Sequence, residues 1–310
     1  MRIVVLTEQV VAGAREDERD VLAQAEFVSS ALRTLGYDVS HLSLGLDLGA
    51  AAAALRDARP DLVFNLCESL AGQGRFIHLA PTLLESLGIR YSGNGADATY
   101  LTSNKLCAKK ILRGSGIPTP PLLGDGSSLA KRYIVKSIWE HASVGLDEDS
   151  VVDAAVAEAE LARRFGPDGF AEAYIDGREF NIAMLAGEVL PHAEMLFEGY
   201  GPQKPRVVGY RAKWDEKSYE YHHTPRRFDF GPEDRALLDT LSWLSRACWR
   251  LFDLRGYARV DFRVDGSGCP FVLEVNTNPC LTPGAGFGAA LERAGISGPS
   301  AVARILADAR

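Results

Sequence analysis

Residues 256–284, GYARVDFRVDGSGCPFVLEVNTNPCLTPG, carry the strongest structural signal in this chain. They predict two strands joined by a turn at DGSGCP, because glycine and proline interrupt an otherwise apolar pattern. Side chains alternate between the two faces of a strand. The polar residues Arg259 and Asp261 therefore share one face of the first strand, and Glu274 and Asn276 share one face of the second. The opposite faces are apolar: Ala258, Val260, Phe262 and Val264, and on the second strand Phe271, Leu273 and Val275.

The register of this hairpin predicts a cluster of oxygen ligands. If Val264 lies opposite Phe271, then Asp261 faces Glu274 and Arg259 faces Asn276. Carboxylates that face each other across strands repel, and the pKa of one rises unless a cation intervenes. Two carboxylates and an amide oxygen are a donor set that suits Mg²⁺, which takes waters and phosphate oxygens as its other ligands. The alternative is the solvated outer face of a half-exposed sheet, and these residues alone leave both open.

Composition narrows the class of protein. The 310 residues suffice for two or three small domains, and 46% hydrophobic with 24% charged residues is typical of a globular protein. A net charge of −7 argues against a nucleic-acid binder. No apolar run approaches the roughly 20 residues of a membrane helix, and MRIVVLTEQ reads as a strand. Five scattered cysteines predict neither disulfides nor a zinc site. We expect a cytoplasmic protein without membrane or nucleic-acid partners.

The order of elements predicts an α/β (α+β) fold. Strands at RIVVLT, YDVSHLSL and DLVFN alternate with helices at 20–35 and 78–88, which predicts a doubly wound parallel sheet over residues 1–95. A helix over 101–116 ends at IPTPP, which indicates a boundary. Further on we expect a strand at 131–138, a helix at 151–165, several strands over 169–197 and a helix over 232–251. The polar segment 198–226 is long enough to predict a functional loop.

Six motifs resemble those of a known family and follow one another along the chain in the family's order. RVDFRVD and FVLEVNTNPCLT resemble the metal-binding strands of ATP-grasp ligases, particularly the D-alanine–D-alanine ligases. GIRYSGNGADATYLTSNKLCAKKILRGSGIPTPP, YIVKSIWEHASVGL, AEAYIDGREFNIAML and GYRAKW resemble the family's domain linker, phosphate loop, adenine hinge and mobile loop. The resemblance implies an ATP-grasp fold of three domains: a Rossmann-like domain at 1–97, a central subdomain at 98–176 and a C-terminal subdomain at 177–310. ATP would be clamped between the last two.

The resemblance also implies residue roles. It assigns ATP phosphates to Lys105, Lys136 and Ser143, with Lys213 at the γ-phosphate. Adenine would be read by Glu172 and by the backbone of Ala173 and Ile175, above Leu273, and Glu179 would hold the ribose. The implied metal ligands are Asp261, Glu274 and Asn276, for two Mg²⁺ ions with Mn²⁺ as an alternative. Arg259 would stabilise the oxyanion of the intermediate, so that Arg259 and Lys213 are the catalytic residues.

Elementary physics bears on some of these assignments independently. A lysine on a buried strand, as predicted for Lys136, needs an anionic partner, although a strand-end lysine that reaches solvent is the alternative. Glu172 and Glu179 flank an Asp-Gly turn, so an ordinary solvent-facing hairpin is equally open from the residues alone. Taken alone, Lys213 reads as a surface lysine.

Departures from the family pattern cluster around the substrates. The phosphate loop has His141, Ala142 and Ser143 where two adjacent serines are usual. Trp214 replaces a tyrosine, Cys280 a glycine and Ala285 a serine. After the third strand, CESLAGQG stands where the family has its His-Gly and Gly-Glu-Asp-Gly motifs. Because lost hydroxyl groups change discrimination between substrates, we expect ATP chemistry to be retained and the substrates to differ. Candidates for the new pocket are His141, Trp214, Glu68, Cys280 and the pair His222-His223, and either Asp20 or Glu18 would bind the first substrate's ammonium.

The resulting prediction is an ATP-dependent carboxylate–amine ligase that forms an amide or peptide bond through an acylphosphate. Its partners would be small amino-acid or dipeptide substrates, its cofactors ATP and Mg²⁺, and the resemblance implies a homodimer. The loop at 198–226 would close to exclude water. Alternatives are a D-alanine–D-alanine ligase with unusual substrate contacts and a non-catalytic ATP-binding module. An NAD-dependent dehydrogenase is disfavoured, because G-x-G-x-x-G is missing after the first strand.

Overall fold

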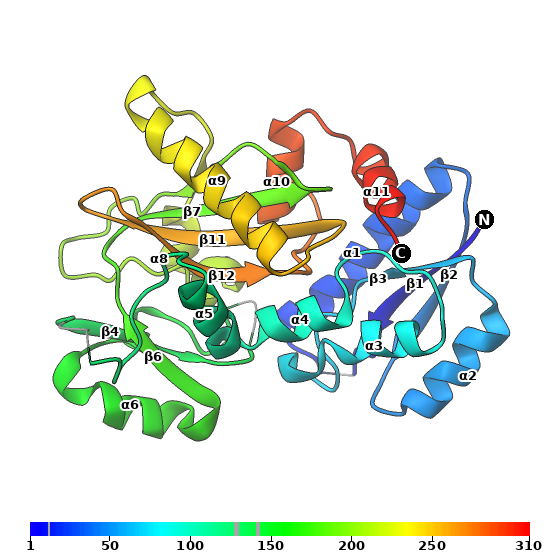
Figure 1. Ribbon diagram of the computed structural model, residues 1–310, viewed down its shortest axis with the longest axis horizontal. Coiled ribbons are helices and arrows are strands. Elements are labelled where there is room, and N and C mark those ends of the chain that lie inside the picture. The colour runs from blue at the N-terminus through cyan, green and yellow to red at the C-terminus, as the bar shows by residue number, and fades with distance from the viewer. Residues whose placement is uncertain (12, 127–129, 141–142) are drawn as a thin grey trace.

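The N-terminal part is a parallel sheet covered by helices. The computed structural model describes residues 1–11, 13–126, 130–140 and 143–310 (Figure 1). Strands β1 (Arg2–Glu8), β2 (Asp38–Leu44) and β3 (Leu62–Asn65) lie in the order β2-β1-β3, all parallel, as predicted. They alternate with α1 (Glu16–Thr34) and α2 (Leu48–Ala58), and α3 (Leu79–Ser86) follows. Helix α1 buries Val21, Val28 and Leu32 and ends before Gly36, whose φ of 82° closes the helix.

The second sheet is small and carries one wall of a cleft. Its order is β5-β4-β6, with β4 at Arg132–Ser137, β5 at Val151–Asp153 and β6 at Gly169–Ala173, and α6 (Ala157–Arg164) covers it. The helix predicted over 151–165 is wrong at its start, because Val151 and Val152 pair with β4 as a strand. β-Branched residues favour that extended pairing.

The helix predicted over 101–116 is two helices. Helix α4 spans Ala96–Ser103 and α5 spans Lys105–Gly114. Asn104 between them is extended (φ −78°, ψ 93°), and its side chain accepts a hydrogen bond from the Cys107 amide at 3.0 Å. An asparagine at this position satisfies an amide that the first turn of a helix leaves open. On α5, Lys105 lines the cleft and Lys109 pairs with Glu172 of the small sheet.

The third sheet is antiparallel and has six strands. Its path is β10-β9-β7-β11-β12, and β8 pairs with β7. The bounds are β7 Gly177–Leu185, β8 Glu188–Val189, β9 Ala193–Met195, β10 Arg226–Arg227, β11 Tyr257–Asp265 and β12 Pro270–Asn276. Helix α9 (Arg235–Leu251) crosses β7 and β11 (Figure 1) and buries Leu241, Leu244 and Cys248 against Val260 and Phe262. The three sheets fall one into each of the ranges 1–97, 98–176 and 177–310, which stay a prediction as domain boundaries.

The register of β11 and β12 agrees with the sequence at the site and differs at the turn. Arg259 lies opposite Asn276 and Asp261 opposite Glu274, but Val264 lies opposite Pro270 instead of Phe271. The register shifts between Asp261 and Phe262, so Leu273 is an extra residue on β12. The predicted apolar face of β12 is therefore wrong: Val272 and Val275 are buried in the core, whereas Leu273 and Glu274 both line the cleft.

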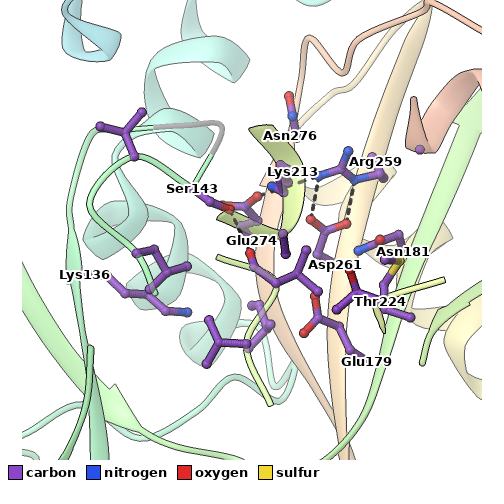
Figure 2. Close-up of a pocket in the computed structure, with 18 of the residues that line it drawn as sticks. Lys136, Ser143, Glu179, Asn181, Lys213, Thr224, Arg259, Asp261, Glu274 and Asn276 are labelled. Atoms are coloured by element: carbon purple, nitrogen blue, oxygen red, sulfur yellow. Dashed lines mark hydrogen bonds and ion pairs between the residues drawn. The ribbon is translucent and has the colours of Figure 1, made fainter. Parts of the chain in front are cut away.

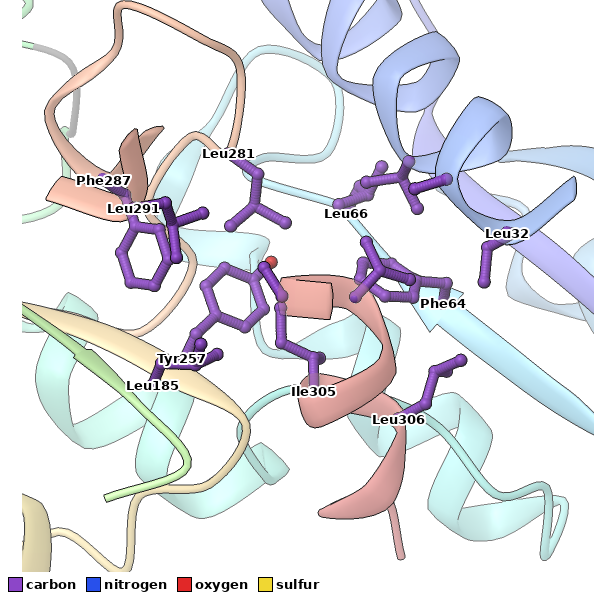
Figure 3. Packing of buried hydrophobic residues seen from close by; sticks show 14 of the residues in the cluster. Leu32, Phe64, Leu66, Leu185, Tyr257, Leu281, Phe287, Leu291, Ile305 and Leu306 are labelled. Carbon is purple, nitrogen blue, oxygen red and sulfur yellow. The ribbon is translucent and has the colours of Figure 1, made fainter. Parts of the chain in front are cut away.

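Two C-terminal helices join the large sheet to the N-terminal sheet. Helices α10 (Gly286–Arg293) and α11 (Gly298–Ala307) follow β12. Phe287 and Ile305 belong to one core with Tyr257 of β11 and Phe64 of β3 (Figure 3). This core fixes the start of β11 against the first sheet. Among the described residues, no helix is long and apolar enough to cross a membrane.

Candidate active site

A cleft of about 600 Å³ brings the predicted site residues together. Its walls are β4 and β6 of the small sheet, β7, β11 and β12 of the large sheet, and segments 207–214 and 221–226, which we call the lid. Figure 2 shows Lys213, Arg259, Asp261 and Glu274 converging in this cleft, with Lys136 across from them. Every residue assigned above to nucleotide, metal or catalysis lines it: Lys105, Lys136, Ser143, Glu172, Ala173, Ile175, Glu179, Lys213, Arg259, Asp261, Leu273, Glu274 and Asn276. Their individual roles stay predictions.

Glu172 neutralises two lysines at the small-sheet wall. Its Oε1 lies 2.7 Å from Lys136 Nζ and its Oε2 lies 2.5 Å from Lys109 Nζ, and the side chains of Glu172 and Lys109 are only 1% exposed. Burial alone would raise the pKa of Glu172, but Lys109 and Lys136 lower it. The anionic partner that Lys136 requires is thus inside the protein. The Glu172 carboxylate is engaged in positioning Lys136, which leaves the backbone of this strand for the predicted contact with adenine.

Lys109 was missed by the sequence interpretation. It follows Lys105 by four residues, which places both on one face of α5, and that spacing is the signal that could have found it. Its Nζ also donates to Thr119 Oγ1 at 3.0 Å and to the Leu273 carbonyl at 3.1 Å. Lys109 therefore ties α5 to β6 and to the bulge of β12, at the junction of two sheets.

Burial disfavours the charged form of two lysines that line the cleft. Burial lowers the pKa of Lys105, whose Nζ donates to the Glu140 carbonyl at 2.5 Å. Burial and then Arg259 lower the pKa of Lys213. An anion bound between these lysines would raise their pKa values again, because it stabilises the charged form. The arrangement fits a phosphate chain better than a neutral ligand.

Arg259 stands between the carboxylates of the predicted metal site. Its Nε and Nη2 donate to Asp261 Oδ1 and Oδ2 at 2.7 and 2.8 Å, and Nη2 lies 4.0 Å from Glu274 Oε1. Burial opposes the charge of Arg259, but Asp261 raises its pKa above the ordinary value. Among the described residues, no group of three or more Asp, Glu, His or Cys side chains is placed to hold a metal. Two carboxylates and the Asn276 amide fit Mg²⁺ provided that phosphate oxygens complete the ligand set.

Glu179, the predicted ribose ligand, is held by an arginine that the sequence interpretation missed. Arg263 Nη2 lies 2.8 Å from Glu179 Oε2, and Arg263 Nη1 donates to the Gly177 carbonyl at 3.0 Å. Burial raises the pKa of Glu179, and Arg263 opposes that rise. The alternation that placed Arg259 and Asp261 on one face also places Arg263 there, so its position could have been predicted.

The lid contacts the predicted phosphate loop. Ser143 Oγ donates to the Val208 carbonyl at 2.9 Å, and the Tyr210 amide donates to the Leu146 carbonyl at 2.7 Å. Helix α7 (Tyr210–Trp214) carries Arg211, which pairs with Glu148 and lies 3.7 Å from Asp147. The hydroxyl of Ser143 is thus bonded to the lid in this structure. These contacts join the lid to the predicted phosphate loop, and its closure against water stays a prediction.

The predicted substrate residues divide into three groups. Glu68, Trp214, Cys280 and Asp20 line the cleft, whereas Glu18 does not and caps α1 with Arg15. His141 lies outside the described residues. His222 and His223 belong to α8 (Tyr219–His223) and are not among the lining residues; the His223 ring stacks on Tyr219, with centroids 3.7 Å apart. The histidine pair is therefore not supported as part of the pocket.

A second carboxyl group lies beside Glu68. The Glu68 amide donates to Glu8 Oε2 at 3.2 Å, and Gln24 Nε2 donates to Glu68 Oε1 at 3.0 Å. Burial, and then the charge of Glu8, raise the pKa of Glu68 to about 8. Burial likewise raises the pKa of Glu8 to about 7. Gln24 also accepts from the Leu281 amide at 2.8 Å, which links α1 to the segment after β12.

Comparison with known proteins places this geometry in context. Residues 127–307 match the family model described as D-ala D-ala ligase C-terminus. The chain is 33% identical to the D-alanine–D-alanine ligase of Acidiphilium cryptum, over 88% of each chain. It is also 33% identical to the uncharacterized protein y4sG of Sinorhizobium fredii, over 91% of this chain and 86% of that protein. The structure of D-alanine–D-alanine ligase from Bacillus anthracis complexed with ATP superimposes with a TM-score of 0.76 at 22% identity, covering 99% and 97% of the chains.

Proposed function

Because this chain belongs to the D-alanine–D-alanine ligase family of ATP-grasp enzymes, we propose that it joins two amino-acid-like substrates of which at least one is not D-alanine. Membership of the family makes it an ATP-dependent ligase that forms a carbon–nitrogen bond. The choice of substrates and the residue roles are the proposal.

The proposed reaction has two steps. A substrate carboxylate attacks the γ-phosphorus of ATP, ADP leaves, and an acylphosphate forms; an amine then attacks the acyl carbon and phosphate leaves. Lys105, Lys136 and Lys213 would hold the phosphates, and Asp261, Glu274 and Asn276 would hold Mg²⁺. Bound Mg²⁺ would neutralise phosphate charge. Arg259 would donate to the tetrahedral oxyanion, and the lid contact through Ser143 would keep water from the acylphosphate.

One observation carries the substrate proposal: four of the residues that depart from the family pattern line the same cleft as those that keep it, namely Glu68, Trp214, Cys280 and Ala285. Ala285 offers no hydroxyl there. Cys280 has its Sγ 2.9 Å from Thr282 Oγ1 and occupies space where the family pattern has glycine. A pocket with different volume and fewer donors discriminates differently between substrates, because an unmatched polar group is costly to bury.

The test is ADP formation with pairs from a panel of D- and L-amino acids and dipeptides, with products identified by mass spectrometry. We expect D-alanine alone to turn over at less than a tenth of the rate of the best pair. Turnover of D-alanine alone at an ordinary enzyme rate, on the order of 10 s⁻¹, would contradict the substrate proposal.

The second candidate is D-alanine–D-alanine ligation itself. It is favoured by the name of the relative from Acidiphilium cryptum, which matches over 88% of this chain. The same panel decides between the two. ATP binding without ADP formation for any pair would indicate a non-catalytic module. The homodimer stays a prediction, for which sedimentation velocity is the direct measurement.

A further inference from the structure

Arg226 is a charged residue of the cleft that the proposed reaction does not use. It begins β10, the edge strand of the large sheet, where Arg226 pairs with Met195 and Arg227 pairs with Glu194. Consecutive residues of a strand point to opposite faces. Arg227 accordingly forms an ion pair with Glu194 away from the cleft, whereas Arg226 lines the cleft.

Within the part of the chain that the structure describes, Arg226 has no carboxylate partner. Its Nη1 donates to the Gly284 carbonyl at 2.7 Å, and no carboxylate of the described residues lies within ion-pair distance of it. The other arginines around the cleft do have such partners: Arg259 has Asp261, and Arg263 has Glu179. Although part of Arg226 is exposed at the mouth of the cleft, burial and then the charge of Arg259 lower its pKa. An anion placed here would remove that repulsion.

Arg226 and Arg259 flank one point in the cleft. A methyl group built on Gly286 would lie 3.5 Å from Arg259 Nη1 and 4.0 Å from Arg226 Nε. Gly286 is the first residue of α10, and the preceding Ala285 has no side chain that could cap the helix. Two guanidinium groups therefore face the same small space from β10 and β11. Arg259 is engaged with Asp261 through Nε and Nη2, and Arg226 is bonded to Gly284 through Nη1 only. Among the described residues, the Nε and Nη2 groups of Arg226 have no hydrogen-bond partner and can bind a ligand beside Arg259 Nη1.

We propose that Arg226 binds the carboxylate of the amine-donating substrate, so that this substrate is an amino acid or peptide with a free carboxylate. A guanidinium offers two parallel N–H groups that match a carboxylate. For the ATP phosphates the proposed ligands are Lys105, Lys136 and Lys213, which belong to α5, β4 and α7 and not to β10. The inference rests on the proposed ligase function, but it does not depend on which amino acid is used.

The experiment compares D-alanine with D-alaninamide, and L-alanine with L-alaninamide, as amine donors alongside the best acyl donor of the panel. We expect the wild type to prefer the acid, and Arg226→Gln to lower kcat/KM for the acid about 10- to 100-fold, the range of a hydrogen bond to a charged group. In this variant, kcat/KM for the amide and the KM for ATP should not change. Arg226→Lys keeps the charge and should recover part of the loss. Arg293→Gln, on the exposed end of α10, is the matched control.

Three results would overturn the inference. If Arg226→Gln lowers kcat/KM equally for the acid and the amide, Arg226 supports the structure and does not bind a carboxylate. If only the KM for ATP rises, Arg226 binds the phosphates instead. A wild type that does not distinguish acid from amide would exclude a carboxylate site. If no pair gives ADP, the ligase proposal fails separately. In that case calorimetry would measure the binding of D- and L-alanine and of their amides to the wild type and to Arg226→Gln. Binding of the acid but not the amide that is lost in the variant would support the carboxylate site. A wild type that shows no such preference for the acid would refute it.

Discussion

Replacing Glu172 with glutamine should destabilise the protein by about 3 kcal/mol. Glu172 is the shared anion of Lys109 and Lys136, at 2.5 and 2.7 Å, and only the Lys136 side chain, 15% exposed, has contact with solvent. Breaking a buried ion pair costs about 3–5 kcal/mol, because the remaining charge stays desolvated. We expect the lower end, since Lys109 keeps its bonds to Thr119 and Leu273 and Lys136 can reach water. That loss is a large part of a typical stability of about 5–15 kcal/mol.

The assay is urea denaturation at pH 7 of wild type, Glu172→Gln and a surface control, Glu188→Gln, whose carboxylate pairs with Arg304 but is 73% exposed. The control should be indistinguishable from wild type, as exposed ion pairs contribute little. Adding Lys109→Met to Glu172→Gln should restore part of the loss, since it removes one unpaired buried charge. A loss below about 1 kcal/mol for Glu172→Gln would refute the reasoning, because it would mean that the buried lysines do not need this anion.

The pH dependence gives the same prediction an independent check. The pKa of Glu172 is lowered in the folded protein, from an ordinary value of 4.5, by Lys109 and Lys136 against the effect of burial. Its stabilisation is therefore complete above pH 4.5 and is lost as the pH falls through the lowered value. The difference in unfolding free energy between wild type and Glu172→Gln should shrink in that acid range. If the difference in unfolding free energy instead grows as the pH falls, the pKa of Glu172 is not lowered in the folded protein.

Three further predictions concern the rest of the site. Asp261→Asn should lower ADP formation at least 100-fold while circular dichroism shows an intact fold, and an undiminished rate would remove Asp261 from the proposed metal site. Burial raises the pKa values of Glu8 and Glu68 from 4.5 to about 7 and about 8, so the folded protein binds more protons than the unfolded chain. Its unfolding free energy should therefore fall as the pH rises from about 5 to 8. Glu68→Gln should make this fall shallower, and an unfolding free energy that rises over this range would refute the raised pKa values. Arg211→Gln, which removes the lid contact to Glu148, should raise the ratio of ADP to ligated product, whereas an unchanged ratio would show that this contact does not exclude water.

Much of the cleft could be predicted because it depends on local periodicity. The alternation along 257–265 placed Arg259 and Asp261 on one face whatever surrounds the strand, since successive side chains point to opposite faces. The pairing of Asp261 with Glu274 was predicted from a register with Val264 opposite Phe271; the turn instead places Val264 opposite Pro270, and the bulge at Leu273 restores the predicted pairing. The parallel N-terminal sheet followed from the alternation of strands and helices, for the same reason of short-range pattern.

Contacts between distant segments could not be predicted in this way. The bulge at Leu273 arises while β11 is paired on its other side with β7 and β12 is tied to Thr119 and Pro118, and none of these constraints is visible within the hairpin. The partner of Lys136 was expected to be a phosphate, and in the protein it is Glu172 on the neighbouring strand, shared with Lys109 from α5. Charge neutrality in a buried space depends on every segment that reaches it.

Residue order thus established the N-terminal strands and the two faces of β11, because hydrogen-bonded backbone imposes short repeats that side-chain chemistry must follow. The family was indicated by six motifs that resemble it. Three-dimensional packing alone settled which charges are neutralised inside the protein and which remain for a ligand. The sequence singled out Arg259 but not Arg226; in the structure Arg259 is engaged by Asp261, whereas Arg226 donates to the Gly284 carbonyl. The reason is that electrostatic pairing acts through space over a few ångströms, between residues that the chain separates by any distance.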